Sequence, residues 1–268
     1  MSPFLHLVLN PVSSPAVLHD LLLSFIVFIT ALIAGTVDTI AGGGGLICLP
    51  VLLLLGLSPQ TALGTNKLQA CFGAGTASYS FYRSGQISST NPELLLGILI
   101  TLLGASLGTL SIIFLSASFI KKIIPYLLLV ALIYILFTPQ KYLHQTKKPK
   151  LNKIIFLIIF GLILGFYDGF FGPGTGSFWA VLIMIFLGLN LKQATMHAKI
   201  FNFSSNLAAL FWFISFGHIN YFIGCVMGIG QALGAILGSQ LVLKQGVKLI
   251  KPVFILMVSV MIGILLKT

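Results

Sequence analysis

Long apolar runs follow one another along almost the whole chain, and polar residues gather in short stretches between them. A helix rises about 1.5 Å per residue, so about 20 apolar residues cross the roughly 30 Å hydrocarbon core of a bilayer. On this measure the pattern predicts long helical segments at residues 18–40, 62–82, 93–116, 120–138, 152–171, 195–216, 219–242 and 248–266. The sequence therefore predicts an all-α polytopic membrane protein.

Two further apolar segments, at residues 45–57 and 176–188, are much shorter. A helix of about 13 residues reaches only about 20 Å, which is too short to cross a bilayer upright. Each segment also follows a glycine-rich stretch. We therefore interpret both as half-helices that begin at a break in the membrane.

The composition supports a membrane protein. Hydrophobic residues make up 57% of the chain and charged residues 7%, and the mean hydropathy is +1.09. The net charge of +11 comes mostly from short loops and from the lysine-rich stretch at 139–151. We interpret it as contact with anionic lipid headgroups of the bilayer and predict no nucleic-acid partner.

The two halves of the chain resemble each other. The stretch "LIAGTVDTIAGGGGLICLP" at 32–50 aligns with "LILGFYDGFFGPGTGSFWA" at 162–180, which pairs Asp38 with Asp168 at an offset of 130. Further on, Lys67 pairs with Lys199, and "LGASLG" at 103–108 pairs with "LGAILG" at 233–238. This order predicts two homologous repeats of about five helical segments each, at 1–138 and 152–268, joined by a cytoplasmic linker at 139–151.

The direction of the repeats depends on how each glycine break meets the membrane. If each repeat crosses five times, or enters and returns at the break, 11 basic residues share one face against 4 on the other. If each repeat crosses four times, the division is 8 against 7 and carries no information. We favour inverted five-plus-five repeats with both termini outside, and four-plus-four parallel repeats stay open.

The glycine breaks are the first candidate site. A helix that begins inside the membrane presents free N–H groups and its positive dipole end, which suit an anion, and glycine lets the backbone approach closely. Paired broken helices of this kind, meeting near the membrane midplane, are typical of secondary transporters. The predicted substrate-binding residues of the breaks are Gly43, Gly44, Gly45, Gly174, Thr175, Gly176 and Ser177.

Two carboxylates lie beside the breaks. Asp38 and Asp168 are two of only four acidic residues in the chain, and they occupy equivalent positions. An ionisable group in the bilayer is costly enough to indicate a function. Coupling to a proton or to substrate is one interpretation, and charge pairing with Lys67 and Lys199 is another; the two are compatible.

A polar stripe follows each half-helix. Lys199, Asn202 and Asn206 share one helical face by their i, i+3, i+7 spacing. We predict substrate binding by Asn66, Lys67, His197, Lys199 and Asn202. The alternative is that these groups only form hydrogen bonds between helices.

Motifs of enzymes and of metal sites are missing from the sequence. The chain has no HExxH, no GxSxG and no CxxC, and Cys48, Cys71 and Cys225 are scattered through apolar segments. We therefore predict no catalytic residue, no metal and no cofactor, and a protein that is not an enzyme.

The motifs "GTVDTIAGGGGLICLPVLLLLGLSPQTALGTNKLQA", "GFYDGFFGPGTGSFW" and "ATMHAKIFNFSSN" resemble the TauE/SafE family of bacterial membrane proteins. The resemblance covers residues 20–266 and includes the duplication. It implies an inner-membrane permease, usually an exporter, for a small sulfur-containing or organic anion such as sulfite or a sulfonate. A passive anion channel of the same architecture is the alternative. The substrate, the direction of transport, the coupling ion and a homo-oligomeric state stay open at this point.

Overall fold

The computed structural model describes residues 15–85, 92–136 and 148–245, and this part of the chain is helical between short turns. The elements in order are α2 (Pro15–Ala41), α3 (Gly44–Leu54), α4 (Pro59–Arg83), α5 (Pro92–Ile113), α6 (Ala117–Leu136), α7 (Lys153–Phe170), α8 (Thr175–Leu182), the π-helical turn η2 (Ile183–Leu187), α9 (Leu191–Ser215) and α10 (Tyr221–Gln245). The first seven predicted long segments each fall on one helix. The eighth, 248–266, lies outside the described residues.

The two predicted half-helices are confirmed as short apolar helices, at Gly44–Leu54 and Thr175–Leu187. Among the described residues, four helices are long and apolar enough to cross a membrane: Asp20–Ala41, Pro92–Ile113, Lys153–Phe170 and Tyr221–Lys244. Large apolar side chains on these helices are exposed, among them Phe25, Leu103, Ile163 and Phe222. Exposed apolar faces of this extent suit contact with lipid.

Local sequence signals mark where several helices begin. Ser58 caps α4 and accepts a hydrogen bond from the Thr61 N–H, with Pro59 following it in the first turn. Asn190 and Gln193 form a reciprocal capping box at the start of α9. These caps begin the two long helices that carry most of the buried polar side chains.

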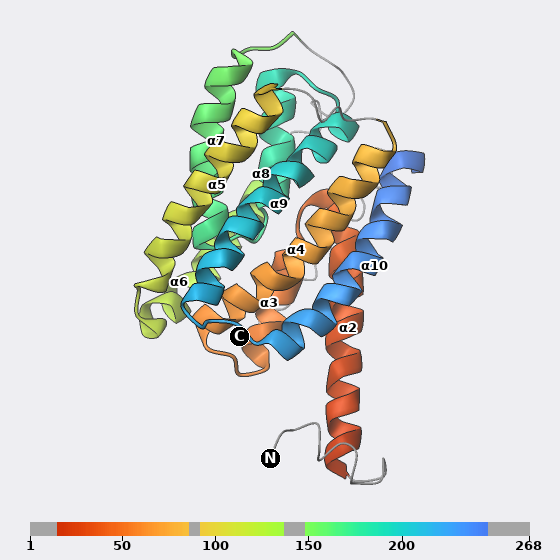
Figure 1. The fold of residues 1–268 in the computed structure, drawn as a ribbon, viewed down its shortest axis with the longest axis vertical. Coiled ribbons are helices and arrows are strands. Elements are labelled where there is room, and N and C mark those ends of the chain that lie inside the picture. The colour runs from red at the N-terminus through yellow and green to blue at the C-terminus, as the bar shows by residue number, and fades with distance from the viewer. Residues whose placement is uncertain (1–14, 86–91, 137–147, 246–268) are drawn as a thin grey trace.

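Helices α4 and α9 pack against each other in the middle of the bundle (Figure 1). Their buried faces are unusually polar for membrane helices. The buried polar side chains on α4 are Gln60, Thr65, Asn66, Lys67 and Gln69, and those on α9 are Thr195, Lys199, Asn202, Ser204, Ser205 and Asn206. The fold thus places two polar helices between the apolar helices that surround them.

The first helix of each half packs against a helix of the other half. Helix α2 lies along α10, and α7 lies along α5. Glycines make both contacts close: a Cβ on Gly234 would lie 2.2 Å from the Leu32 carbonyl oxygen, and a Cβ on Gly104 would lie 2.6 Å from that of Leu162. The two contacts involve positions 130 residues apart: Gly234 follows Gly104 by 130 residues, and Leu162 follows Leu32 by 130.

The long helices run through the bundle in two opposite directions. In Figure 1, α2, α4 and α10 run from the bottom to the top, whereas α5, α7 and α9 run from the top to the bottom. The two members of each of three pairs, α2 and α7, α4 and α9, and α5 and α10, therefore run in opposite directions.

Candidate functional site

Both helix breaks form at glycines with a backbone conformation that other residues rarely adopt. Between α2 and α3, Gly42 has a φ of +77°. Between α7 and α8, Gly172 and Gly174 have φ values of +100° and +88°. Since Gly lacks a Cβ, it takes these conformations without steric cost. The glycine runs thus allow the chain to turn sharply between two helices.

The two breaks contact each other directly through their backbones. A Cβ on Gly42 would lie 2.3 Å from the Ser177 nitrogen, and a Cβ on Gly176 would lie 2.7 Å from the Gly42 Cα. The Ser177 hydroxyl donates a hydrogen bond to the Ala41 carbonyl oxygen. The breaks therefore meet, although their depth in a bilayer stays a prediction.

Two ion pairs connect the polar helices to the broken helices of the opposite half. Lys67 on α4 lies 2.7 Å from Asp168 on α7. Lys199 on α9 lies 2.7 Å from Asp38 on α2. Both lysine side chains are 1% exposed. Burying a charge is affordable only when it is paired, so each aspartate offsets the cost of burying its lysine.

The two carboxylates have different surroundings. Asp168 is 1% exposed and accepts hydrogen bonds from Lys67, Ser205 and Asn206, while Lys67 also donates to the Asp168 backbone oxygen. Asp38 is 15% exposed and accepts hydrogen bonds from Lys199 and from the Gly44 N–H at the start of α3. The Asp38 carboxylate thus occupies the helix N-terminus where the sequence predicts an anion.

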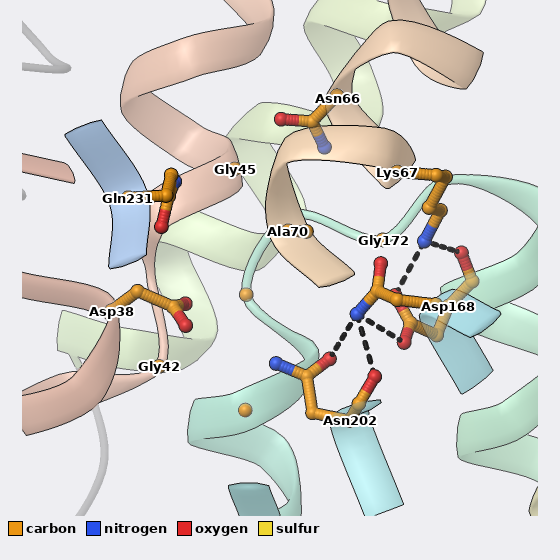
Figure 2. A pocket seen from close by; sticks show the side chains of 13 residues that line it. Asp38, Gly42, Gly45, Asn66, Lys67, Ala70, Asp168, Gly172, Asn202 and Gln231 are labelled. Carbon is orange, nitrogen blue, oxygen red and sulfur yellow. Dashed lines mark hydrogen bonds and ion pairs between the residues drawn. The ribbon is translucent and has the colours of Figure 1, made fainter. Parts of the chain in front are cut away.

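A small polar cavity lies where the breaks meet the two polar helices (Figure 2). Its volume is about 20 Å³, which is room for roughly one water molecule. The lining residues are Asp38, Gly42, Gly45, Asn66, Lys67, Ala70, Asp168, Gly172, Gly174, Gly176, Asn202, Asn206 and Gln231. Figure 2 shows Asp38 and Gln231 on one side of it and the Lys67–Asp168 pair on the other.

The cavity brings together eight of the residues that the sequence singles out: Asp38, Gly45, Asn66, Lys67, Asp168, Gly174, Gly176 and Asn202. Six others are not among its lining residues: Gly43, Gly44, Thr175, Ser177, His197 and Lys199. Lys199 connects to the cavity through Asp38. The hydroxyls of Thr175 and Ser177 donate to the backbone oxygens of Gly172 and Ala41. His197 contacts the Gln193 carbonyl oxygen through Nδ1.

Sequence reasoning left some lining residues out of the site. Asn206 was recognised as part of the polar stripe, and its amide donates to both Asp168 and Asn202. Gln231 is buried on α10 and was not singled out. A polar residue inside the apolar stretch "GIGQALGA" is the signal that could have found it.

In the ranges 15–85, 92–136 and 148–245, no group of three or more His, Cys, Asp or Glu residues is placed to hold a metal ion. The polar atoms of the cavity are carboxylates, amides, one ammonium group and backbone groups.

Apolar helices around a buried polar site between two helix breaks define a polytopic membrane protein of the transporter type. The model of the family "Sulfite exporter TauE/SafE" matches residues 27–265, and the chain belongs to this family of membrane transporters.

Curated relatives carry the same general description. A "Probable membrane transporter protein" of Haemophilus influenzae is 43% identical over 232 residues, which cover 87% of this chain and 90% of the relative. "Probable membrane transporter protein YfcA" of Escherichia coli K12 is 41% identical over 240 residues, covering 90% and 88%. "Probable membrane transporter protein ORF9" of a Sinorhizobium species is 39% identical over 243 residues, covering 91% of each. No solved structure matches the chain.

Proposed function

We propose that this membrane transporter is a secondary transporter that holds a small anion between its two glycine breaks. The substrate class is a sulfur-containing or organic anion such as sulfite or a sulfonate, and the direction is export across the bacterial inner membrane. The family description supports a sulfur oxyanion.

The observation that carries the proposal is the pair of buried lysines around the cavity. Lys67 lines it, and Lys199 is one hydrogen bond behind Asp38, which lines it. The amides of Asn66 and Asn202 add hydrogen-bond donors from the two polar helices. Ammonium groups and amide donors in a site that excludes bulk water are what an oxyanion needs, once a lysine is released from its aspartate.

We further propose that the two halves are inverted repeats, at 1–138 and 152–268 with the linker at 139–151. The opposite directions of equivalent helices in Figure 1 support this. So do the glycine contacts and ion pairs, which recur at equivalent positions. An inverted repeat lets the two halves exchange conformations, which is how such proteins open a central site to each side in turn.

A passive anion channel is the second candidate. Direct backbone contact between Gly42 and Gly176, beside a cavity for roughly one water molecule, favours the transporter, because a larger anion requires these groups to move. Counterflow in proteoliposomes separates the two: a transporter accumulates labelled anion against its gradient, whereas a channel only equilibrates it.

Binding to the purified protein tests the anion site. A ligand that binds only the folded state raises the melting temperature as its concentration rises. We expect a shift with one or more of sulfite, thiosulfate and sulfoacetate, and its loss in Lys199→Gln, which removes the charge but keeps a polar side chain. Stabilisation by cations or uncharged solutes alone would contradict an anion site.

A further inference from the structure

The two buried ion pairs differ in how fully their carboxylates are satisfied. Asp168 is held by an ammonium, a hydroxyl and an amide, and it is 1% exposed. Asp38 is held by one ammonium and one backbone N–H, and it is 15% exposed. A carboxylate with fewer donors loses less when it takes up a proton. Asp38 is therefore the less firmly held and the more exposed carboxylate of the two.

The charge of Asp38 determines whether the charged groups at the cavity are balanced. Asp38 lines the cavity and separates it from Lys199, which does not line it. While Asp38 is ionised, the two aspartates balance Lys67 and Lys199, and the four groups carry no net charge. A proton on Asp38 leaves the Lys199 charge uncompensated, and this charge attracts an anion strongly in a site with little water.

From this arrangement we propose that Asp38 is the coupling proton site and that Lys199–Asp38 is the ion pair that opens, while Lys67–Asp168 stays closed. The proposal rests on the proposed function, because it needs an anion to bind. One proton from solvent binds an Asp38 oxygen, the ion pair with Lys199 is lost, and one anion takes the place of the carboxylate charge. The proton and the anion then leave together.

Within residues 15–85, 92–136 and 148–245, the charged and titratable groups around Asp38 are Lys199 on α9, the Cys48 thiol on α3, and the Lys67–Asp168 pair on α4 and α7. The only histidine considered for the site, His197, contacts the Gln193 backbone and does not line the cavity.

The test is the pH dependence of thiosulfate binding by the full-length purified protein, measured as thermal stabilisation. Thiosulfate keeps its own charge between pH 6 and pH 8. If binding requires one proton, affinity falls by up to about tenfold for each pH unit above the pKa of that group. We expect this fall in the wild type, no fall in Asp38→Asn, which imitates the protonated acid, and a wild-type fall in the control variant Glu93→Gln, which changes a partly exposed acid away from the cavity to its amide.

A retained fall in Asp38→Asn, or loss of the fall in Glu93→Gln, would each overturn the assignment. Equal thiosulfate affinity at both pH values in the wild type would overturn it while leaving the anion site intact. Absence of binding by every anion at both pH values would overturn the proposed function as well.

Discussion

At the scale of single residues, glycines with the same backbone conformation serve different needs. Gly42 and Gly56 have φ values of +77° and +80°. A Cβ on Gly42 would collide with the backbone of Ser177 at 2.3 Å, whereas a Cβ on Gly56 would have no atom within 4 Å. Glycine is therefore required at position 42 by both its positive φ and its close contact with Ser177, and at position 56 by its positive φ alone.

This difference predicts unequal effects of Gly42→Ala and Gly56→Ala. In both variants an alanine must adopt a left-handed backbone conformation, which costs about 1–2 kcal/mol. Gly42→Ala additionally forces the two breaks apart, so we expect a clearly larger drop in melting temperature in detergent and loss of anion binding. Equal drops in the two variants would mean that the contact between the breaks contributes little.

The sequence predicted those site residues that have a counterpart of the same kind in the other half of the chain. Asp38 and Lys199 were found because Asp168 and Lys67 stand at the equivalent places. Gln231 was missed because Thr101 stands at its equivalent place, so comparing the halves gives no signal there. The ion pairs themselves join residues of opposite halves. Which residues pair depends on how the helices pack, and a local sequence pattern does not contain this information.

At the scale of elements, the apolar pattern predicted where helices lie, but it did not predict which helices pack together. Glycine spacing in "LGASLG" and "LGAILG" indicates close packing against some partner. The structure shows that each partner comes from the other half: α5 packs on α7, and α10 packs on α2. Identifying the partner needs long-range contacts that spacing within one helix does not contain.

This packing predicts similar damage from Gly104→Val and Gly234→Val. Each valine would meet the carbonyl oxygen of a facing helix, that of Leu162 or Leu32. We expect both variants to lower the melting temperature in detergent. Leu103→Val and Leu233→Val, which introduce valine at the exposed neighbouring positions, are matched controls and should have little effect. Damage at only one of the two glycines would contradict equivalent roles for the two contacts.

At the scale of the whole molecule, basic residues gather at one end of the bundle. Arg83 lies in the last turn of α4 and Lys244 in that of α10, while Lys153 begins α7 and Lys192 follows the first residue of α9. These four helix ends lie at the top of Figure 1. The Lys192 ammonium donates to the Leu243 backbone oxygen, which joins two of them. Basic ends of this kind favour the cytoplasmic side.

The topology predicts opposite accessibility for Gly56→Cys and Gly85→Cys in a variant that lacks the three native cysteines. Both positions are exposed turns with positive φ and open space, so the two substitutions are closely matched. They lie at opposite ends of α4. We expect a membrane-impermeant thiol reagent to label Gly56→Cys from outside the inner membrane, and Gly85→Cys only after permeabilisation. Labelling of both from the same side would exclude this topology.

The pairing of α2 with α10 also constrains how the protein is made. Gly35 meets its partner Gln231 only after a further 196 residues have been synthesised, since 231 minus 35 is 196. At about 5–20 residues per second this takes roughly 10–40 s. Lys199 follows Asp38 by 161 residues, so Asp38 lacks its partner for about 8–32 s of that time. The nascent chain therefore passes through a stage with Asp38 unpaired and then a stage with the glycine face of α2 uncovered. A chain terminated before α10 stays at the second stage, and membrane quality-control proteases can recognise it.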